Sequence, residues 1–311
     1  MSATIKGAAA ELGTERIRKL LVQYAVPAVI AMTAASLYNM VDSIFIGHGV
    51  GPLAISGLAL TFPLMNLAAA FGSLVGVGAA TLVSMRLGQR DYETAQNILG
   101  NVVVLNLIIG LSFGLVTLLF LDPILYFFGA SDATIGYARD YMTIILLGNV
   151  ITHMYLGLNA VLRASGHPRK SMYATIITVV INAVLDPIFI FGLFGVPKMG
   201  VAGAAYATIL GQWIAAAIGL VMNIRKNPEV SISMKGFRPH GATIRRILSI
   251  GIPSVVMQSI GSIMTFLMNQ ILIAFSATAV AVFGVYFKLQ SFVFMPVFGL
   301  NNGTVPIVAY N

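Results

Sequence analysis

Long runs of apolar residues alternate with short polar segments along the whole chain. A run of about 20 apolar residues is the length of a helix that crosses the hydrocarbon layer of a membrane. The pattern predicts eight spans, over residues 21–47, 53–85, 97–121, 138–162, 172–194, 200–223, 247–275 and 279–310. We expect residues 1–20 to form a polar lead-in. The chain is therefore predicted to be an all-α polytopic membrane protein.

Composition supports this prediction and narrows the class of protein. The chain has 311 residues, of which 58% are apolar and only 9% are charged, whereas soluble domains carry about 25% charged residues. Its mean hydropathy is +0.91. It contains no cysteine, which excludes disulfides and cysteine-based metal or redox sites. The polar lead-in does not have the form of a cleavable signal peptide, so we expect the first span to direct insertion.

The basic residues predict the orientation. Of the 18 lysines and arginines, 15 lie in residues 1–20 or in the loops after the second, fourth and sixth spans. Basic loops face the cytoplasm, so the N-terminus is predicted to be cytoplasmic and the protein integral to the plasma (inner) membrane. The same bias explains the net charge of +8. We therefore expect the lipid bilayer, and no nucleic acid, as a partner.

An internal repeat divides the chain. Arg18–Leu21, followed by Pro27, resembles Arg245–Leu248, followed by Pro253, about 227 residues later. The same relation links Phe71, Gly72 and Gly76 to Phe298, Gly299 and Gly303. Six spans separate the copies, so both have one orientation and are related by a pseudo-twofold axis along the membrane normal. We predict a first six-helix lobe (21–224), a cytoplasmic linker (225–244), and the first two spans of a second lobe (245–311), truncated before its other four.

Two acids lie deep within predicted spans, Asp42 in the first and Asp186 in the fifth. A charge at that depth costs roughly 3 kcal/mol on insertion scales. Asn182 precedes Asp186 by one helical turn on the same face, and Pro187 leaves the carbonyl of Ala183 without its N–H partner. Such oxygens suit a small cation or a proton. The alternative is that Asp186 only hydrogen-bonds a neighbouring helix, but the second acid argues against it.

If the two acids converge, they titrate as a unit, and a proton or Na⁺ neutralises the excess charge. Tyr38 precedes Asp42 by one turn, so we expect its phenol to hydrogen-bond the Asp42 carboxyl.

Several motifs together resemble the multidrug and toxic compound extrusion (MATE) family, in its prokaryotic form, over residues 15–311. They are Tyr38–Asp42 with Ile46 and Gly47, Arg163–Pro168, Asn182 with Asp186 and Pro187, Met199–Ala205, and Phe294–Pro296 with Gly299 and Gly303. The resemblance implies a cation-coupled exporter of organic, often cationic, drugs. It also implies two six-helix lobes with a cleft between them.

The family's first-lobe cation site carries over to Asp42, Asn182 and Asp186, which would also be the ligands if the ion is Na⁺. The resemblance extends the site to Tyr38, Tyr141, Asn159 and Thr208. For Asn159 and Thr208, ordinary hydrogen bonding between helices remains the alternative. Movement of the first span about Pro27, or of the fifth about Pro187, would give alternating access.

Polar residues of the last two spans are candidates for a drug path. Gln258, Asn269, Gln290 and Asn301 are uncharged, and Lys288 adds a charge within the eighth span. The lysine could move within the cleft and report protonation. Alternatively it extends its amine to the membrane surface or pairs with Gln290.

The sequence thus predicts a secondary antiporter that exports organic cations in exchange for H⁺ or Na⁺, functions as a monomer and needs no other cofactor. A flippase for lipid-linked precursors is the first alternative. Its anionic cargo would require arginines in the cleft, whereas the arginines here lie in loops. A channel or a structural membrane protein is the second, and the repeat with off-centre acids argues against it. No catalytic pairing, zinc motif or cofactor fingerprint indicates an enzyme.

Overall fold

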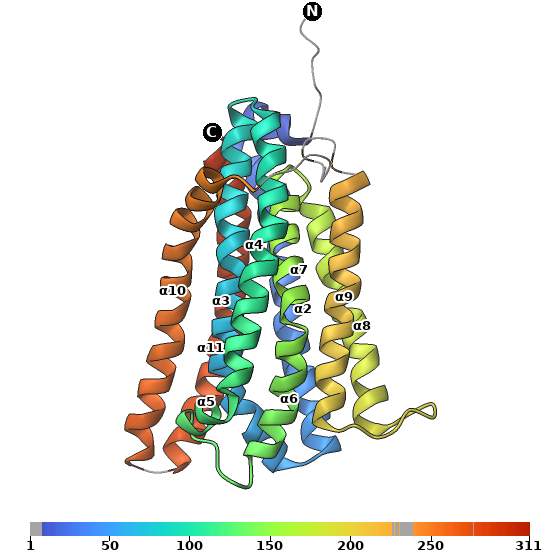
Figure 1. The fold of residues 1–311 in the computed structure, drawn as a ribbon, viewed down its shortest axis with the longest axis vertical. Helices are drawn as coiled ribbons and strands as arrows, with labels where there is room; N and C mark the ends of the chain where they lie inside the picture. Colours follow the sequence, from blue (N-terminus) through green and yellow to red (C-terminus); the bar gives the residue numbers. More distant parts are fainter. Residues whose placement is uncertain (1–7, 226, 228–229, 231–238, 276) are drawn as a thin grey trace, which may run out of the picture.

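Helices packed side by side make up the described chain in a computed structural model (Figure 1), which describes residues 8–225, 227, 230, 239–275 and 277–311. A short 3-10 turn, η1 (Ala8–Ala10), and α1 (Glu11–Thr14) precede the long helices. The others are α2 (Ile17–Gly49), α3 (Pro52–Gly88), α4 (Tyr92–Leu119), α5 (Leu121–Phe127), α6 (Ile135–Leu147), α7 (Asn149–Ala164), α8 (Pro168–Phe191), α9 (Val201–Arg225), α10 (Gly241–Ile273) and α11 (Ala277–Tyr310).

The apolar runs coincide with these helices. Within the described residues, seven helices are long and apolar enough to cross a membrane, and the number is eight if the bent pair α6 and α7 forms one span. The prediction of an all-α polytopic membrane protein is confirmed.

The predicted fourth span differs from a single straight helix. It is broken at Gly148 into α6 and α7, which meet at 55°. A Cβ atom at Gly148 would overlap the side chain of Ile209 on α9. The break therefore lies where α9 packs directly against the backbone, which only glycine permits.

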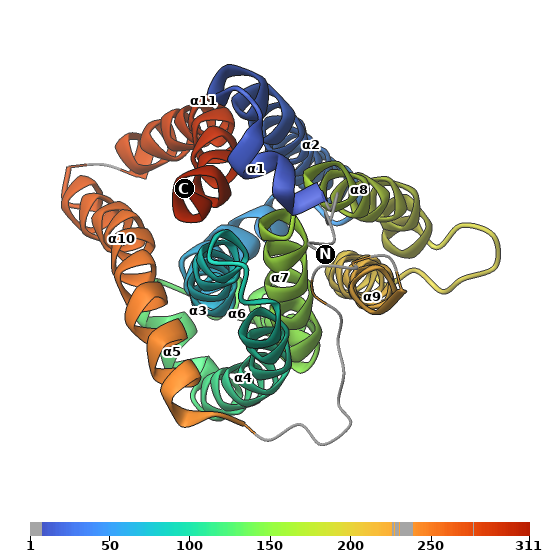
Figure 2. The same ribbon diagram turned by 90° about the horizontal axis from the view of Figure 1, so that it is seen from above.

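Helix α3 lies among α4, α6, α7, α10 and α11 (Figure 2). Helix α3 packs against α4 and α7, while α8 packs against α2 and α9. The two helices that the repeat assigns to a second lobe pack across this group, α10 on α3 and α11 on α2. At one end of the bundle, the amide of Asn311 donates to the carbonyl of Leu12 at 3.0 Å.

We call this end the basic end, because it carries Arg16, Arg86, Arg163 and Arg245 at the corresponding helix ends (Figure 1). The opposite, far end carries α5 and the loop after α8.

Glycines bring α10 and α11 into direct backbone contact with α3 and α2. A Cβ atom at Gly303 of α11 would lie 2.7 Å from Cα of Ala25, and one at Gly299 would lie 2.7 Å from Cα of Val29. Gly251 of α10 likewise faces the Leu74 carbonyl of α3. Small residues permit such close approach of membrane helices. Each of these contacts lies in the half of its helix that is nearer the basic end.

We predict that Gly303→Val loosens the α2–α11 contact. The new side chain meets backbone atoms that cannot move aside, and overpacking of this kind costs about 1–3 kcal/mol. Thermal unfolding of the detergent-purified protein should therefore begin at a lower temperature. Gly261→Ala on α10 is the control, since its Cβ atom would meet nothing within 4 Å. Equal stability of the two variants would contradict the proposed packing.

An ion pair ties α5 to α6 at the far end. Arg139 donates to both carboxylate oxygens of Asp122, at 2.8 and 2.7 Å. The hydrogen bonds from Arg139 hold the pKa of the exposed Asp122 carboxyl below its ordinary value.

A carboxyl whose pKa is lowered by folding stabilises the fold above its ordinary pKa, and this stabilisation is lost as the pH falls through the folded-state pKa. We therefore predict that Asp122→Asn lowers the unfolding temperature slightly at pH 7, and that variant and wild type converge below about pH 4. A constant difference at all pH values would exclude the ion pair as its cause.

Candidate cation site

Asp42 of α2 and Asp186 of α8 meet inside the bundle near its far end. Asp186 is fully buried and Asp42 is 9% exposed. Their carboxyl groups are close enough to interact directly. Two carboxyl groups can hydrogen-bond only when one carries a proton, and two neighbouring negative charges repel strongly away from water. The pair is thus suited to hold a proton or a small cation between two oxygens.

Tyr38 contacts the acid on the other helix. Its hydroxyl donates to Oδ2 of Asp186 at 2.8 Å. The expected hydrogen bond to Asp42, one turn away on the same helix, is therefore not the one that forms. The phenol is longer than the aspartate side chain, so it extends across the α2–α8 contact. As a result it cross-links the two acid-bearing helices.

Tyr141 of α6 and Thr208 of α9 complete the surroundings. Tyr141 is 3% exposed, and Thr208 lies beside the phenols of both Tyr38 and Tyr141. We call the set Tyr38, Asp42, Tyr141, Asp186 and Thr208 the acid cluster. Helices α2, α6, α8 and α9 contribute to it, and all four belong to the predicted first lobe.

Asn182 lies one turn before Asp186 and faces α9. Its Oδ1 atom lies against Gly211, where a Cβ atom would overlap it. This oxygen, and Oδ1 of both Asp42 and Asp186, are buried without a hydrogen-bond donor among the described residues. Leaving such atoms unpaired is costly. They are the carboxylate and amide oxygens that a hard cation binds, so the residues fit H⁺ or Na⁺.

Within the described part of the chain, no group of three or more His, Cys, Asp or Glu side chains could hold a metal ion.

Asn159 does not lie in the acid cluster. Its amide donates to the Thr175 hydroxyl at 3.3 Å. Thr175 precedes Asp186 by eleven residues, which is about 16 Å along a helix. The structure therefore places Asn159 nearer the basic end, where α7 faces the first half of α8.

Both candidate hinge prolines lie inside continuous helices, Pro27 in α2 and Pro187 in α8. Pro27 is buried close to the contact with Gly299 of α11, and Pro187 directly follows Asp186. Their roles as hinges stay predictions.

The candidate drug-path residues are scattered along α10 and α11. Gln258 donates to the Ser73 hydroxyl at 2.8 Å and so links α10 to α3. Gln290 is partly buried and Asn301 is exposed. The side chains of Asn269 and Lys288 lie outside the described part of the structure.

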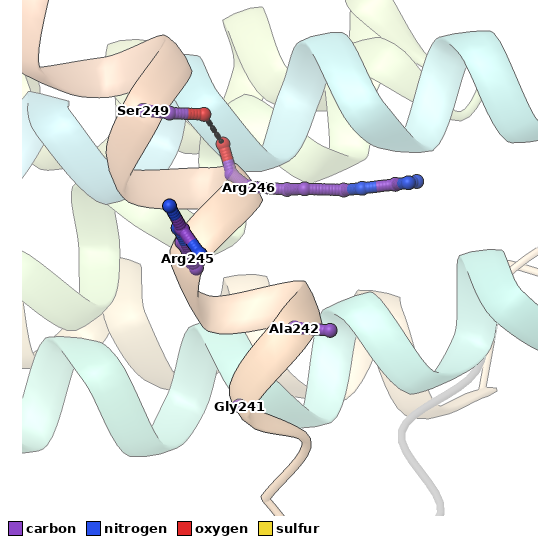
Figure 3. A pocket seen from close by; sticks show the side chains of 5 residues that line it. All are labelled: Gly241, Ala242, Arg245, Arg246 and Ser249. Carbon is purple, nitrogen blue, oxygen red and sulfur yellow. Dashed lines mark hydrogen bonds between the residues drawn. The ribbon is translucent and has the colours of Figure 1, made fainter.

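A hollow of about 560 Å³ lies at the start of α10 (Figure 3). It is lined by Gly241, Ala242, Arg245, Arg246 and Ser249. It is at the basic end, opposite the acid cluster, and none of the candidate drug-path residues lines it. The Ser249 hydroxyl donates to the Arg246 carbonyl at 2.9 Å.

Sequence reasoning overlooked a polar stripe on α8 that leads away from the acid cluster. The signal is present in the sequence, because polar residues recur there every three or four positions. The stripe consists of Ser171, Thr175, Thr178, Asn182 and Asp186. It also overlooked Gly211, whose importance depends on the packing of α9 against Asn182.

Comparisons with known proteins identify relatives of this chain. The MatE family model matches residues 27–188. The multidrug export protein MepA of Staphylococcus haemolyticus is 32% identical over 295 residues, which are 95% of this chain and 64% of that protein. MepA of Staphylococcus aureus strain NCTC 8325 is 31% identical, with 94% of this chain and 64% of that protein covered. The chain thus spans about 64% of the length of these curated relatives.

Solved structures show the same fold. A multidrug resistance MATE family transporter of the MOP superfamily, in an outward-facing conformation, has a TM-score of 0.88 at 30% identity, covering 98% of this chain and 67% of that one. The MATE multidrug transporter DinF-BH has a TM-score of 0.88 at 35% identity, covering 96% of this chain and 66% of that one. Since the family model matches more than half of the chain, the chain belongs to the MATE family, whose members are membrane transporters and not enzymes.

Proposed function

We propose that the protein exports organic, cationic drugs across the membrane in exchange for H⁺ or Na⁺. The observation that carries this proposal is the acid cluster. Two carboxyl groups meet there within the membrane-spanning part of the chain, and neither forms an ion pair with a described basic residue. Relatives described as multidrug export proteins support the export of drugs. A site that must bind a positive charge supports coupling to a cation.

The cation would act through α2. This helix carries Asp42 towards the far end and contacts α11 through Ala25 and Val29 towards the basic end. Binding of a cation removes the repulsion between Asp42 and Asp186, so the relative position of α2 and α8 changes. Movement of α2 about Pro27, or of α8 about Pro187, would then alter the α2–α11 contact and give access to alternate sides of the membrane.

The driving force is sufficient for such an exchange. One elementary charge that crosses a potential of 100 mV supplies about 2.3 kcal/mol, and each 1.4 kcal/mol supports about a tenfold concentration ratio.

The distribution of basic residues and the internal repeat support the other parts of the proposal. The protein lies in the plasma (inner) membrane with its basic end in the cytoplasm. Residues 21–224 form the first lobe, 225–244 the linker and 245–311 the start of the second lobe. The protein functions as a monomer, and Gln258, Asn269, Gln290, Lys288 and Asn301 contribute to the drug path.

Replacement of either acid should abolish coupled export. In proteoliposomes that contain the full-length protein, an imposed H⁺ or Na⁺ gradient should drive the flux of a fluorescent organic cation. Asp42→Asn and Asp186→Asn should reduce this flux by about 100-fold or more, as expected when a required charge is lost. Asp140→Asn, an exposed acid on α6, is the control.

Comparison of the two gradients identifies the coupling ion. Full flux in both variants would contradict the proposed coupling site. If neither gradient drives flux of any organic cation by the wild type, the export of cationic drugs is wrong, and flipping of lipid-linked precursors becomes the leading hypothesis.

Substitution of Gly211 tests the role of Asn182 while Asn182 itself is kept. Gly211→Ala places a methyl group where the Asn182 carbonyl oxygen lies. The amide must move, and cation affinity should fall by about tenfold, the effect of losing one ligand worth roughly 1.4 kcal/mol. Gly219→Ala on the same helix is the matched control, because its Cβ atom would lie 3.7 Å from Leu158 in ordinary contact. Equal affinity in the two variants would show that Asn182 does not bind the cation.

A further inference from the structure

The polar stripe of α8 extends from the acid cluster to the basic end. Ser171, Thr175, Thr178, Asn182 and Asp186 recur every three or four residues and so share one face of the helix. Ser171 and Asp186, at the two ends of the stripe, are fifteen positions apart, which is about 22 Å along a helix. The stripe is covered by neighbouring helices: Ser171 is 2% exposed, Thr178 7% and Asn182 4%. It is therefore an internal feature of the predicted first lobe.

Helix α7 supplies polar partners to this stripe. The Arg163 guanidinium donates to the Ser171 hydroxyl at 3.3 Å. The Asn159 amide donates to the Thr175 hydroxyl at 3.3 Å, and the Tyr155 and Thr175 hydroxyls are 2.9 Å apart. We call these seven residues the α7–α8 seam: Tyr155, Asn159 and Arg163 of α7 with Ser171, Thr175, Thr178 and Asn182 of α8.

Helix α9 lies against the seam at Asn182 and also contributes to the acid cluster. Gln212 hydrogen-bonds Thr152 of α7 and directly follows Gly211, against which Asn182 lies. Thr208, one turn earlier on α9, belongs to the acid cluster. Polar atoms therefore continue from Asp186 through Asn182 towards Thr175 and Ser171.

Hydrogen bonding between helices does not account for all of these atoms. Polar side chains that only hold membrane helices together have partners for their buried groups. In the seam, Oδ1 of Asn159 and Oδ1 of Asn182 are buried and accept no hydrogen bond from a described residue. Each is an oxygen acceptor within a largely buried polar path. Such oxygens stabilise a passing Na⁺ or the water that carries a proton.

We infer that the α7–α8 seam is an intralobe passage through which the coupling cation moves between the acid cluster and the basic end, separately from the drug cleft. This inference rests on the proposed function, since it concerns the cation that the acid cluster exchanges. It adds a route by which the cation reaches the cytoplasmic side without passing the drug.

Arg163 closes the passage at the basic end. It lies in the last turn of α7, is only partly exposed and forms no ion pair with a described acid. Its fixed positive charge repels any cation that approaches Ser171. The passage therefore conducts only when Arg163 moves, which prevents a continuous leak of ions.

Cysteine accessibility tests the passage directly. The chain contains no cysteine, so a single introduced thiol has no background from this chain. Thr178→Cys places a thiol in the seam. Ala160→Cys is the matched control: it is 6% exposed against 7% for Thr178, but it faces Gly76 of α3 instead. The full-length protein would be treated in oriented vesicles with aminoethyl methanethiosulfonate, a small cationic reagent, added on the side of the basic end.

We expect Thr178→Cys to react at least about tenfold faster than Ala160→Cys, because a polar passage admits water and a cation whereas an apolar interior does not. Equally slow reaction at both positions would overturn the passage.

The second measurement is passive cation leak without drug. In liposomes under an imposed potential, Arg163→Gln should raise the leak of H⁺ or Na⁺ by about tenfold, since the closing charge is removed. Arg169→Gln, at an exposed arginine nearby, should leave it unchanged. Separate H⁺ and Na⁺ gradients show which ion uses the route. No increase in Arg163→Gln would contradict the closing role.

These readouts do not depend on drug transport. If the seam thiol reacts and Arg163→Gln leaks while no organic cation is exported, the passage stands and the proposed drug export is wrong. If cation-driven export occurs while the seam thiol stays unreactive and the Arg163→Gln variant shows no added cation leak, the proposed export stands and the proposed passage is wrong.

Discussion

Two carboxyl groups that share one buried position are the constraint on which the rest of this structure depends. Asp42 and Asp186 are 144 positions apart in the chain, yet their carboxyl groups are close enough to interact directly. Repulsion between two negative charges in a medium of low dielectric constant would separate α2 from α8. A proton or cation removes that repulsion, and the Tyr38 phenol joins the two helices at the same point. We therefore propose that the packing of this part of the bundle is coupled to its occupancy by a positive charge.

In the proposed mechanism, such a local change would reach the rest of the molecule through the contacts of α2. Helix α2 carries Asp42 near the far end and packs on Gly299 and Gly303 of α11 near the basic end. These contacts involve backbone atoms, so they tolerate little deformation. A shift of α2 against α8 must then be absorbed by sliding on α11 or by bending near Pro27. The acid cluster and the α2–α11 contact thus lie near opposite ends of α2.

Most of the fold, and the two acids at the centre of the candidate site, could be predicted from the sequence. Apolar runs define the membrane spans because burial in lipid demands uninterrupted helices, and the cost of a buried charge singles out Asp42 and Asp186. Other features depend on neighbours that are distant in sequence. The break at Gly148 arises because Ile209 of α9 packs there. Tyr38 contacts Asp186 because its phenol extends between helices, which spacing along one helix does not reveal.

The position of Asn159 illustrates the same limit. Its side chain faces Thr175, one part of a polar stripe that periodicity alone places on one side of α8. Which helix covers that stripe, and how far each partner lies from the acids, follow only from the antiparallel packing of α7 and α8.

The most direct test of this account is the stoichiometry of cation binding to the purified full-length protein, without a membrane gradient or drug. Proton uptake and radiolabelled Na⁺ binding would be measured for the wild type, Asp42→Asn, Asp186→Asn and the double variant. If the acids form one shared site, each single substitution should remove the same bound cation, and the double variant should lose no more than either single variant. Independent losses that add in the double variant would show that the two carboxyl groups bind separately, and would contradict the central claim.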